Sequence, residues 1–213
     1  MARTTGSDGE KTEAALREAA LTLMARHGYE AVTMRQLAAG IGVQAAALYR
    51  YFPTKEDLLF TLMREHMEGL LAAWEAARPP SSEPPARLAA FVRNHISFHV
   101  ARRHSTHVSN MELRSLSRER LSAILKMRSA YEKELRRILR EGAEAGDFLV
   151  EDPKLTAMAI IQMITGVIVW FRPGERLSVD DVTAKYLTMT MRLVGAGTIG
   201  ENGHVRPHAE IRA

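Results

Sequence analysis

Cysteine is absent from this sequence of 213 residues. Disulfides, thiolate nucleophiles and cysteine-ligated zinc or iron–sulfur sites are therefore excluded, and the composition suits a reducing cytoplasm, where we expect the protein to act. Long hydrophobic runs are also scarce. The longest uncharged apolar stretch, residues 155–171, falls short of the ~20 residues that a membrane helix needs. We expect no membrane span and interpret this stretch as a buried helix.

Sequence patterns of catalysis are missing as well. The chain has no glycine-rich phosphate loop, no G-x-S-x-G motif and no paired His-Glu metal motif. We therefore expect neither an enzyme nor a bound cofactor.

Runs of alternating β-branched residues are lacking, whereas apolar residues recur with helical spacing and Gly or Pro falls between the periodic blocks. These patterns predict an all-α fold. Helices are expected over about 10–27, 34–39, 44–51, 54–77, 87–103, 107–115, 117–145, 152–171 and 178–196.

The first three of these helices predict a helix-turn-helix head over residues 10–56, preceded by a flexible arm over residues 1–9. Gly28 ends the first helix, Thr33 caps the second, and Gly40-Ile41-Gly42 forms the turn before the third. The four prolines of residues 78–86 predict a linker. Residues 57–197 are expected to form a helical body that binds a ligand and dimerises, and residues 198–213 a flexible tail.

Charge is distributed unevenly in the predicted head. The chain carries 29 Lys and Arg against 25 Asp and Glu, a net charge of +4, but residues 1–57 are balanced, so overall basicity does not locate a DNA-binding face. Between Ala31 and Lys55, however, three cations occur without any carboxylate. Such a local field attracts phosphates.

Residues 33–59, TMRQLAAGIGVQAAALYRYFPTKEDLL, resemble the sequence signature of the TetR family of repressors. The resemblance covers about residues 10–60 closely and the remainder loosely. It implies a dimer that binds a near-palindromic DNA operator, with the helix Gln44–Tyr51 in the major groove. It also implies phosphate contacts by Thr33, Tyr49, Tyr51 and Lys55, and a base contact by Arg35.

The expected recognition helix departs from the usual pattern because it opens with Gln44 followed by three alanines. Alanines make no side-chain hydrogen bonds to bases, although Ala45 and Ala46 can pack on thymine methyl groups. Sequence specificity would then rest on Gln44, Arg35 and Arg50 together with DNA shape.

The body resembles, more faintly, TetR regulators that sense acyl-CoA esters. Two stretches carry this resemblance, ELRSLS at residues 112–117 and VWFRPGERLS at residues 169–178. The resemblance implies an acyl-CoA effector. Gly166 is smaller than the residue common at this place in that group, which predicts an enlarged or reshaped pocket.

Helical spacing places Arg128 within the apolar stripe of its helix, between Leu121 and Leu139. Three interpretations stay open: a buried pair with a carboxylate, an extended stem with a solvated head, or contact with a ligand anion. His95 and His99 likewise share an inward face. They can line a pocket or core, or serve a metal site, although zinc needs three or four ligands.

The candidate effector site combines these polar residues with apolar side chains expected to face inward. Arg102, Arg114 and Arg172 near helix ends could meet CoA phosphates, and Trp170 could stack on the ligand or pack on a neighbouring helix. The candidate ligand-binding residues are Phe91, His95, His99, Met111, Met127, Arg128, Tyr131, Gln162, Thr165, Gly166, Val169 and Trp170.

Together these patterns predict a homodimeric transcriptional repressor that binds operator DNA and is released by a small amphipathic effector, such as an acyl-CoA ester. We expect the helices over 152–171 and 178–196 to form the dimer. Two alternatives remain: a constitutive DNA-binding protein whose body only dimerises, and a metal-responsive regulator that uses His95 and His99.

Overall fold

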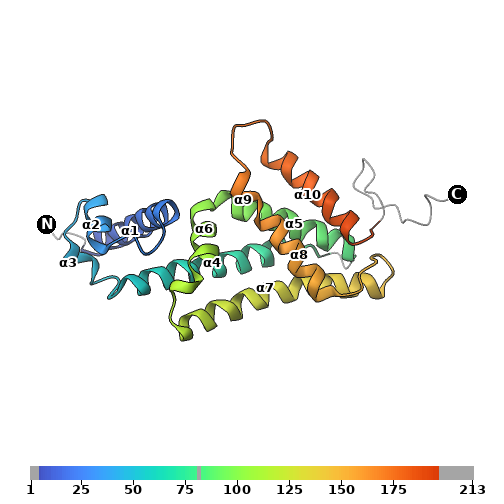
Figure 1. Cartoon of the computed structure of the whole chain (residues 1–213), viewed down its shortest axis with the longest axis horizontal. Coiled ribbons are helices and arrows are strands. Elements are labelled where there is room, and N and C mark those ends of the chain that lie inside the picture. The colour runs from blue at the N-terminus through green and yellow to red at the C-terminus, as the bar shows by residue number, and fades with distance from the viewer. Residues whose placement is uncertain (1–4, 81–82, 197–213) are drawn as a thin grey trace. The chain divides into compact units, whose positions relative to one another are not determined.

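The computed structural model describes residues 5–80 and 83–196. Over these residues every regular element is a helix, which confirms the all-α class (Figure 1). The described chain forms two compact units, residues 5–68 with 102–126 and residues 69–101 with 127–196. These units do not follow the predicted boundary at residues 56–57, because residues 102–126 pack with the head. The expected tail over 198–213 and residues 1–4 of the expected arm lie outside the described residues.

The first unit begins with four helices, α1 (Thr5–His27), α2 (Met34–Gly40), α3 (Ala45–Leu48) and the N-terminal part of α4 (Lys55–Ala77). Leu16, Ala20 and Met24 follow each other at four-residue spacing on α1 and are fully buried. Helix α1 packs on α2, and α2 packs on α3, whose Leu48 is also fully buried. This arrangement is the predicted helix-turn-helix.

Two glycines end helices in this unit. Gly28 adopts φ +80° after α1 and donates its N–H to the carbonyl of Met24 at 2.9 Å, and Gly42 adopts φ +71° in the turn between α2 and α3. Helix α1 starts at Thr5, so part of the expected flexible arm is helical. Helix α3 is shorter than predicted, because the chain turns after Leu48 toward Pro53.

The first unit continues with α6 (Arg103–Met111), the 3-10 helix η1 (Leu113–Ser115) and the start of α7 (Arg118–Glu144). Helix α6 packs on α1. The expected helix over 107–115 is wrong in both bounds. The hydroxyls of Ser105 and Thr106 both donate to the carbonyl of Arg102 at 3.0 Å, and no Gly or Pro marks the start of α6 in the sequence.

In the second unit, α5 (Pro84–Ala101) begins inside the predicted linker. Proline is accepted in the first turn of a helix, where its missing N–H has no helical partner anyway. The buried face of α5 includes Leu88, Phe91 and Ile96, and α7 contributes the fully buried Leu135 and Ile138.

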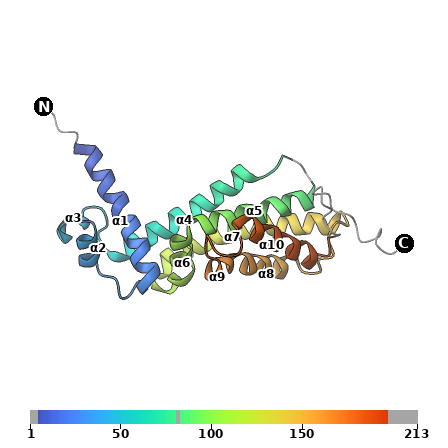
Figure 2. The same ribbon diagram turned by 90° about the horizontal axis from the view of Figure 1, so that it is seen from above.

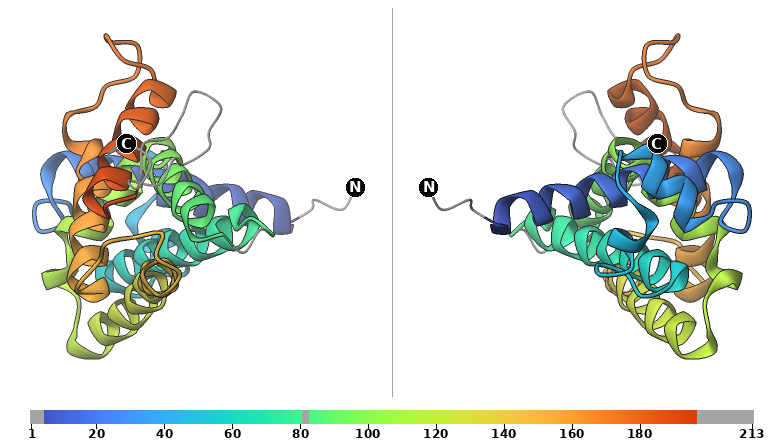
Figure 3. Two further views of the ribbon diagram at one scale, coloured as in Figure 1. Left: turned by 90° about the vertical axis from the view of Figure 1, so that its right-hand side faces the viewer. Right: turned by 90° about the vertical axis from the view of Figure 1, so that its left-hand side faces the viewer.

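The last helices of this unit are α8 (Pro153–Thr165), α9 (Val167–Trp170) and α10 (Val179–Leu193). Helix α5 packs on all three, and α9 continues from α8 (Figure 2). The expected single helix over 152–171 is interrupted at Gly166. Ser178 and Asp181 form a capping box that starts α10 after the loop of residues 171–178, which arches out from α9 and α10 (Figure 3).

The segment Pro153–Trp170 has a mean hydropathy of 1.4 over 18 residues, enough by length and composition to cross a membrane, yet only 28% of it is buried inside this chain. The expectation of a buried helix is therefore wrong for a single copy. Its exposed side chains include Leu155 at 62% and Met158 at 48%.

Gly142 in α7 lies directly against an aromatic ring. A Cβ at this position would lie 2.1 Å from Cδ2 of Phe148, whose side chain is buried. The backbone N–H groups of Asp147 and Phe148 both donate to the carbonyl of Gly142, at 2.8 and 3.1 Å, so the ring is held over the glycine.

We therefore expect Gly142→Ala to lower the free energy of unfolding by about 2 kcal/mol. Overpacking lowers the free energy of unfolding by about 1–3 kcal/mol, whereas replacing a helical glycine by alanine raises it by at most about 1 kcal/mol. Denaturant unfolding of the full chain measures the change. In a Phe148→Ala background the same substitution should be neutral or stabilising, and equal losses in both backgrounds would contradict this explanation.

Candidate functional site

The second helix of the head begins with a complete capping box. The hydroxyl of Thr33 accepts the backbone N–H of Gln36 at 3.2 Å, and Oε1 of Gln36 accepts the backbone N–H of Thr33 at 2.8 Å. The predicted N-cap is therefore confirmed. Such a helix start presents backbone N–H groups that can bind a phosphate.

The predicted DNA-contacting side chains lie on α2, on α3 and in the turns that flank them. Arg35 and Gln44 are exposed, as are Ala46, Tyr49 and Arg50, whereas Ala45, Tyr51 and Lys55 are half-buried. Leu48 and Phe52 hold this segment to the core. Nothing in the geometry tests the individual DNA contacts, which stay predictions.

Lys55 already has partners within the unit. Its Nζ donates to the carbonyls of Tyr29 and Val32 at 3.0 and 3.1 Å, and lies 4.0 Å from the centroid of the Tyr29 ring. The predicted phosphate contact must therefore share this ammonium group with the segment between α1 and α2.

The second unit contains a cluster of polar side chains in its core, which we call the histidine cluster: His95 and His99 of α5, Arg128 and Tyr131 of α7, and Thr165 of α8. Nε2 of His95 lies 2.8 Å from the Thr165 hydroxyl, and Nδ1 lies 3.3 Å from the Tyr131 hydroxyl. The two imidazoles stack with centroids 3.9 Å apart. The sequence placed all five residues in the candidate effector site, and the fold brings them together.

Burial determines the charge state of this cluster. It lowers the pKa of His99 to about 4, a shift that the nearby positive charge of Arg128 increases. Nδ1 of His99 donates to the carbonyl of His95 at 2.7 Å, because a carbonyl can only accept. Burial also lowers the pKa of Arg128 and raises that of Tyr131. At neutral pH both the His99 ring and the Tyr131 hydroxyl are uncharged.

An aromatic wall adjoins the histidine cluster. The ring of Phe91 lies 4.8 Å from that of Tyr131 and 5.1 Å from that of Trp74, with the Trp74 contact edge-on. Phe91 is fully buried, as expected. Trp74 was not among the predicted residues, because it follows the head on a helix whose face toward the body cannot be deduced from spacing alone.

Ligation of a metal by His95 would require breaking one of its two hydrogen bonds. Within residues 5–80 and 83–196, no group of three or more His, Asp or Glu side chains is arranged to hold a metal ion. The geometry therefore favours the pocket or core interpretation of this pair.

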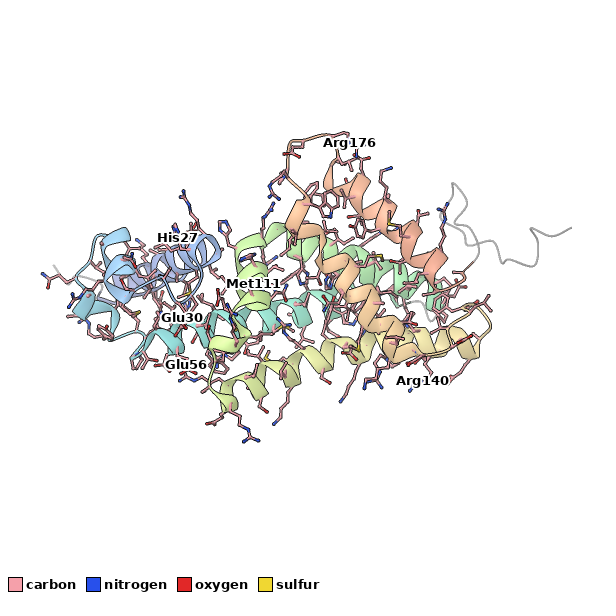
Figure 4. All side chains as sticks on the ribbon, in the orientation of Figure 1. His27, Glu30, Glu56, Met111, Arg140 and Arg176 are labelled. Atoms are coloured by element: carbon pink, nitrogen blue, oxygen red, sulfur yellow. The ribbon has the colours of Figure 1, made fainter. Side chains whose placement is uncertain are left out.

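Several predicted effector residues lie elsewhere. Met111, at the end of α6 in the first unit (Figure 4), is 60% exposed, and Val169 is 71% exposed, so the expectation that both face inward is wrong. Spacing identifies one face of a helix but not whether this chain covers it. Gln162 is exposed, and Met127 and Gly166 are half-buried.

Trp170 packs on its neighbour, which is one of the two roles considered for it. Its ring stacks on Tyr186 of α10 with centroids 6.3 Å apart, and Nε1 donates to the Tyr186 hydroxyl at 3.3 Å. Among the predicted cations, Arg102 and Arg114 belong to the first unit. Arg172 donates to the carbonyls of Val169 and Phe171, each at 3.0 Å.

Two parts of the chain match known protein families. Residues 16–62 match the family described as bacterial regulatory proteins, tetR family, and residues 81–194 match the tetracyclin repressor-like C-terminal domain. The HTH-type transcriptional repressor KstR2 of Rhodococcus jostii RHA1 is 25% identical over 190 residues, which cover 88% of this chain and 92% of the relative.

Solved structures of regulators have a similar fold. A tetR-family regulatory protein from Rhodococcus RHA1 superposes with a TM-score of 0.84 at 34% identity, covering 88% of this chain and 99% of that one. AibR in complex with isovaleryl coenzyme A and operator DNA gives a TM-score of 0.75 at 25% identity, with 87% and 99% coverage. These relatives are regulators, not enzymes. The chain belongs to the TetR family of DNA-binding transcriptional regulators.

Proposed function

We propose that this regulator is a homodimeric repressor whose affinity for operator DNA falls when a small amphipathic effector binds at the histidine cluster. The observation that carries the proposal is the convergence of polar side chains from α5, α7 and α8 beside the buried rings of Phe91 and Trp74. Ligand sites in proteins commonly combine apolar walls with a few placed polar groups. A bacterial regulator that binds operator DNA would act in the cytoplasm.

An acyl-CoA ester, or failing that another amphipathic carboxylate, suits this cluster. Phe91 and Tyr131 offer apolar surface to an acyl chain, while the Thr165 hydroxyl can donate a hydrogen bond to a carbonyl when it accepts one from Nε2 of His95. The solved complex of AibR with isovaleryl coenzyme A supports the class, since that protein shares the fold at 25% identity.

Arg128 is the group proposed to meet the anionic part of the effector. Burial lowers the pKa of its guanidinium because the charged form loses hydration. A carboxylate or phosphate beside it would stabilise the charged form through charge-assisted hydrogen bonds. The effector would lower DNA affinity only if it binds the released conformation more tightly than the DNA-bound one.

The dimer is proposed to form through α8, α9 and α10. Each of these helices exposes large apolar side chains, which are unusual on a solvent-facing surface when they gather on one set of helices. They are Leu155, Met158, Val169, Trp170, Met189 and Leu193. Two copies related by a two-fold axis would bury these side chains against each other.

For DNA binding, we expect Arg35→Ala to weaken binding to an operator selected from random duplexes. A lost contact to a guanine should cost about 1–3 kcal/mol and be confined to one position in each half-site. Binding measured on a panel of single-base variants tests this, with Arg64→Ala on α4 as a control. A uniform loss on all duplexes would make Arg35 a phosphate contact instead.

For the effector, calorimetric titration with isovaleryl-CoA, longer acyl-CoAs and the free acids should find a ligand. Arg128→Met should then weaken its binding at least tenfold (about 1.4 kcal/mol). The matched control is Arg136→Met, which alters a surface ion pair with Glu132 on the same helix. Absence of binding by every CoA ester would reject the class. Unchanged affinity of Arg128→Met would reject the role of Arg128.

For the dimer, light scattering at micromolar concentration should give twice the mass of one chain. Met158→Glu combined with Leu193→Glu should give monomers, because each charge would be buried in the contact without a partner. Leu125→Glu on α7, whose leucine is 47% exposed, is the control and should stay dimeric. A monomeric wild-type protein would contradict the proposal.

A further inference from the structure

The ELRSLS stretch of residues 112–117 lies in the first unit, at the end of α6, and its first residue is a buried carboxylate. Glu112 is 9% exposed. Its Oε1 accepts the backbone N–H of Tyr29 at 3.0 Å, and its Oε2 accepts the hydroxyl of Ser115 at 3.3 Å. A buried carboxylate is stable only where such donors replace water. Both oxygens are therefore committed to protein groups.

Tyr29 is held from its other side by the start of α4. The carbonyl of Tyr29 accepts a hydrogen bond from Lys55, whose ammonium also covers the tyrosine ring and reaches the carbonyl of Val32. The segment between α1 and α2 is thus bound at one peptide N–H by the end of α6 and at two carbonyls by α4.

Gly28 makes the first of these bonds possible. Its φ of +80° turns the chain after α1, and a Cβ on it would lie 3.6 Å from Oε1 of Glu112. Few L-residues adopt this conformation. The turn therefore aims the N–H of Tyr29 at the carboxylate.

The same ELRSLS stretch also binds the first turn of α4. The backbone N–H of Ser117 donates to Oε1 of Glu56 at 2.8 Å, a bond that lowers the pKa of Glu56, and Arg120 pairs with Asp57. Residues 112–120 consequently bind the chain on both sides of α2 and α3. They bind it before α2 through Tyr29 and after α3 through Glu56 and Asp57.

We infer that Glu112 is a positioning residue for DNA binding: by accepting the N–H of Tyr29 it sets the direction in which the chain enters α2, and hence the placement of α2 and α3 on the major groove. Thr33, the N-cap of α2, lies only four residues beyond Tyr29. This inference rests on the proposed function, because it concerns binding to a specific operator.

The test compares the full-length protein with Glu112→Gln and Glu112→Leu on a duplex enriched from a random pool by the wild-type protein, and on a scrambled duplex. Glutamine keeps an acceptor oxygen of the same reach, whereas leucine keeps the volume and removes the acceptor. Glu112→Leu should weaken operator binding at least tenfold and binding to the scrambled duplex less than threefold, since phosphate contacts need no fixed register. Glu112→Gln should stay within threefold of wild type on both.

Hydrogen exchange at the amide of Tyr29 provides a readout that lost stability alone would not reproduce. Exchange there should accelerate in Glu112→Leu and stay slow in Glu112→Gln. Glu141→Leu, which removes an ion-pair partner of buried Arg87 in the second unit, serves as the control for lost stability and should leave this amide and the ratio of the two affinities unchanged. If Glu112→Leu does not fold, Glu112→Asp replaces it with the same expected losses, because its oxygens are withdrawn by one methylene.

Wild-type affinity in Glu112→Leu, or equal losses in Glu112→Gln and Glu112→Leu, would overturn the role of the acceptor. Enrichment of no duplex by the wild-type protein is a different result, which would overturn the proposed function and this inference with it.

Discussion

Buried polar groups must find hydrogen-bond partners inside the protein, and this constraint organises both compact units. An unsatisfied buried donor or acceptor costs about 1–3 kcal/mol, a large share of the stability of a domain. In the first unit the carboxylate of Glu112 meets the N–H of Tyr29, and in the second unit His95 bridges Thr165 and Tyr131. Each bond joins elements far apart in the sequence, so each fixes the relative placement of helices that carry a candidate site.

The helix-turn-helix was predictable because its determinants are local. Thr33 and Gln36 lie three residues apart, and the capping box they form needs no other element. Gly28 and Gly42 end helices through their own backbone conformations. The histidine cluster was predictable for a related reason, since helical spacing put His95 and His99 on the face of α5 that also carries Phe91.

Some features of the structure were missed. The start of α5 at Pro84 was missed because prolines usually mark a break, whereas here two of them lie in the first turn of a helix. The break at Gly166 was missed because the segment around it is uncharged throughout. Met111 has an apolar side chain of the kind found in protein cores, but it is exposed. The role of Glu112 in binding Tyr29 could not be deduced either, because 83 residues separate the two partners. The signal available was that Glu112 is the one carboxylate among residues 102–118.

Lys55 shows how a structural role and a DNA contact can coincide. An ammonium group has three N–H donors, and the carbonyls of Tyr29 and Val32 use two of them. The remaining donor is sufficient for one phosphate oxygen, so the phosphate contact implied by the family resemblance is compatible with the bonds in this structure. A phosphate at that place would hold the ammonium, and the ammonium in turn holds the chain that leads from α1 to α2. DNA binding and the placement of the recognition helix would then favour each other, since both depend on hydrogen bonds from the Lys55 ammonium group.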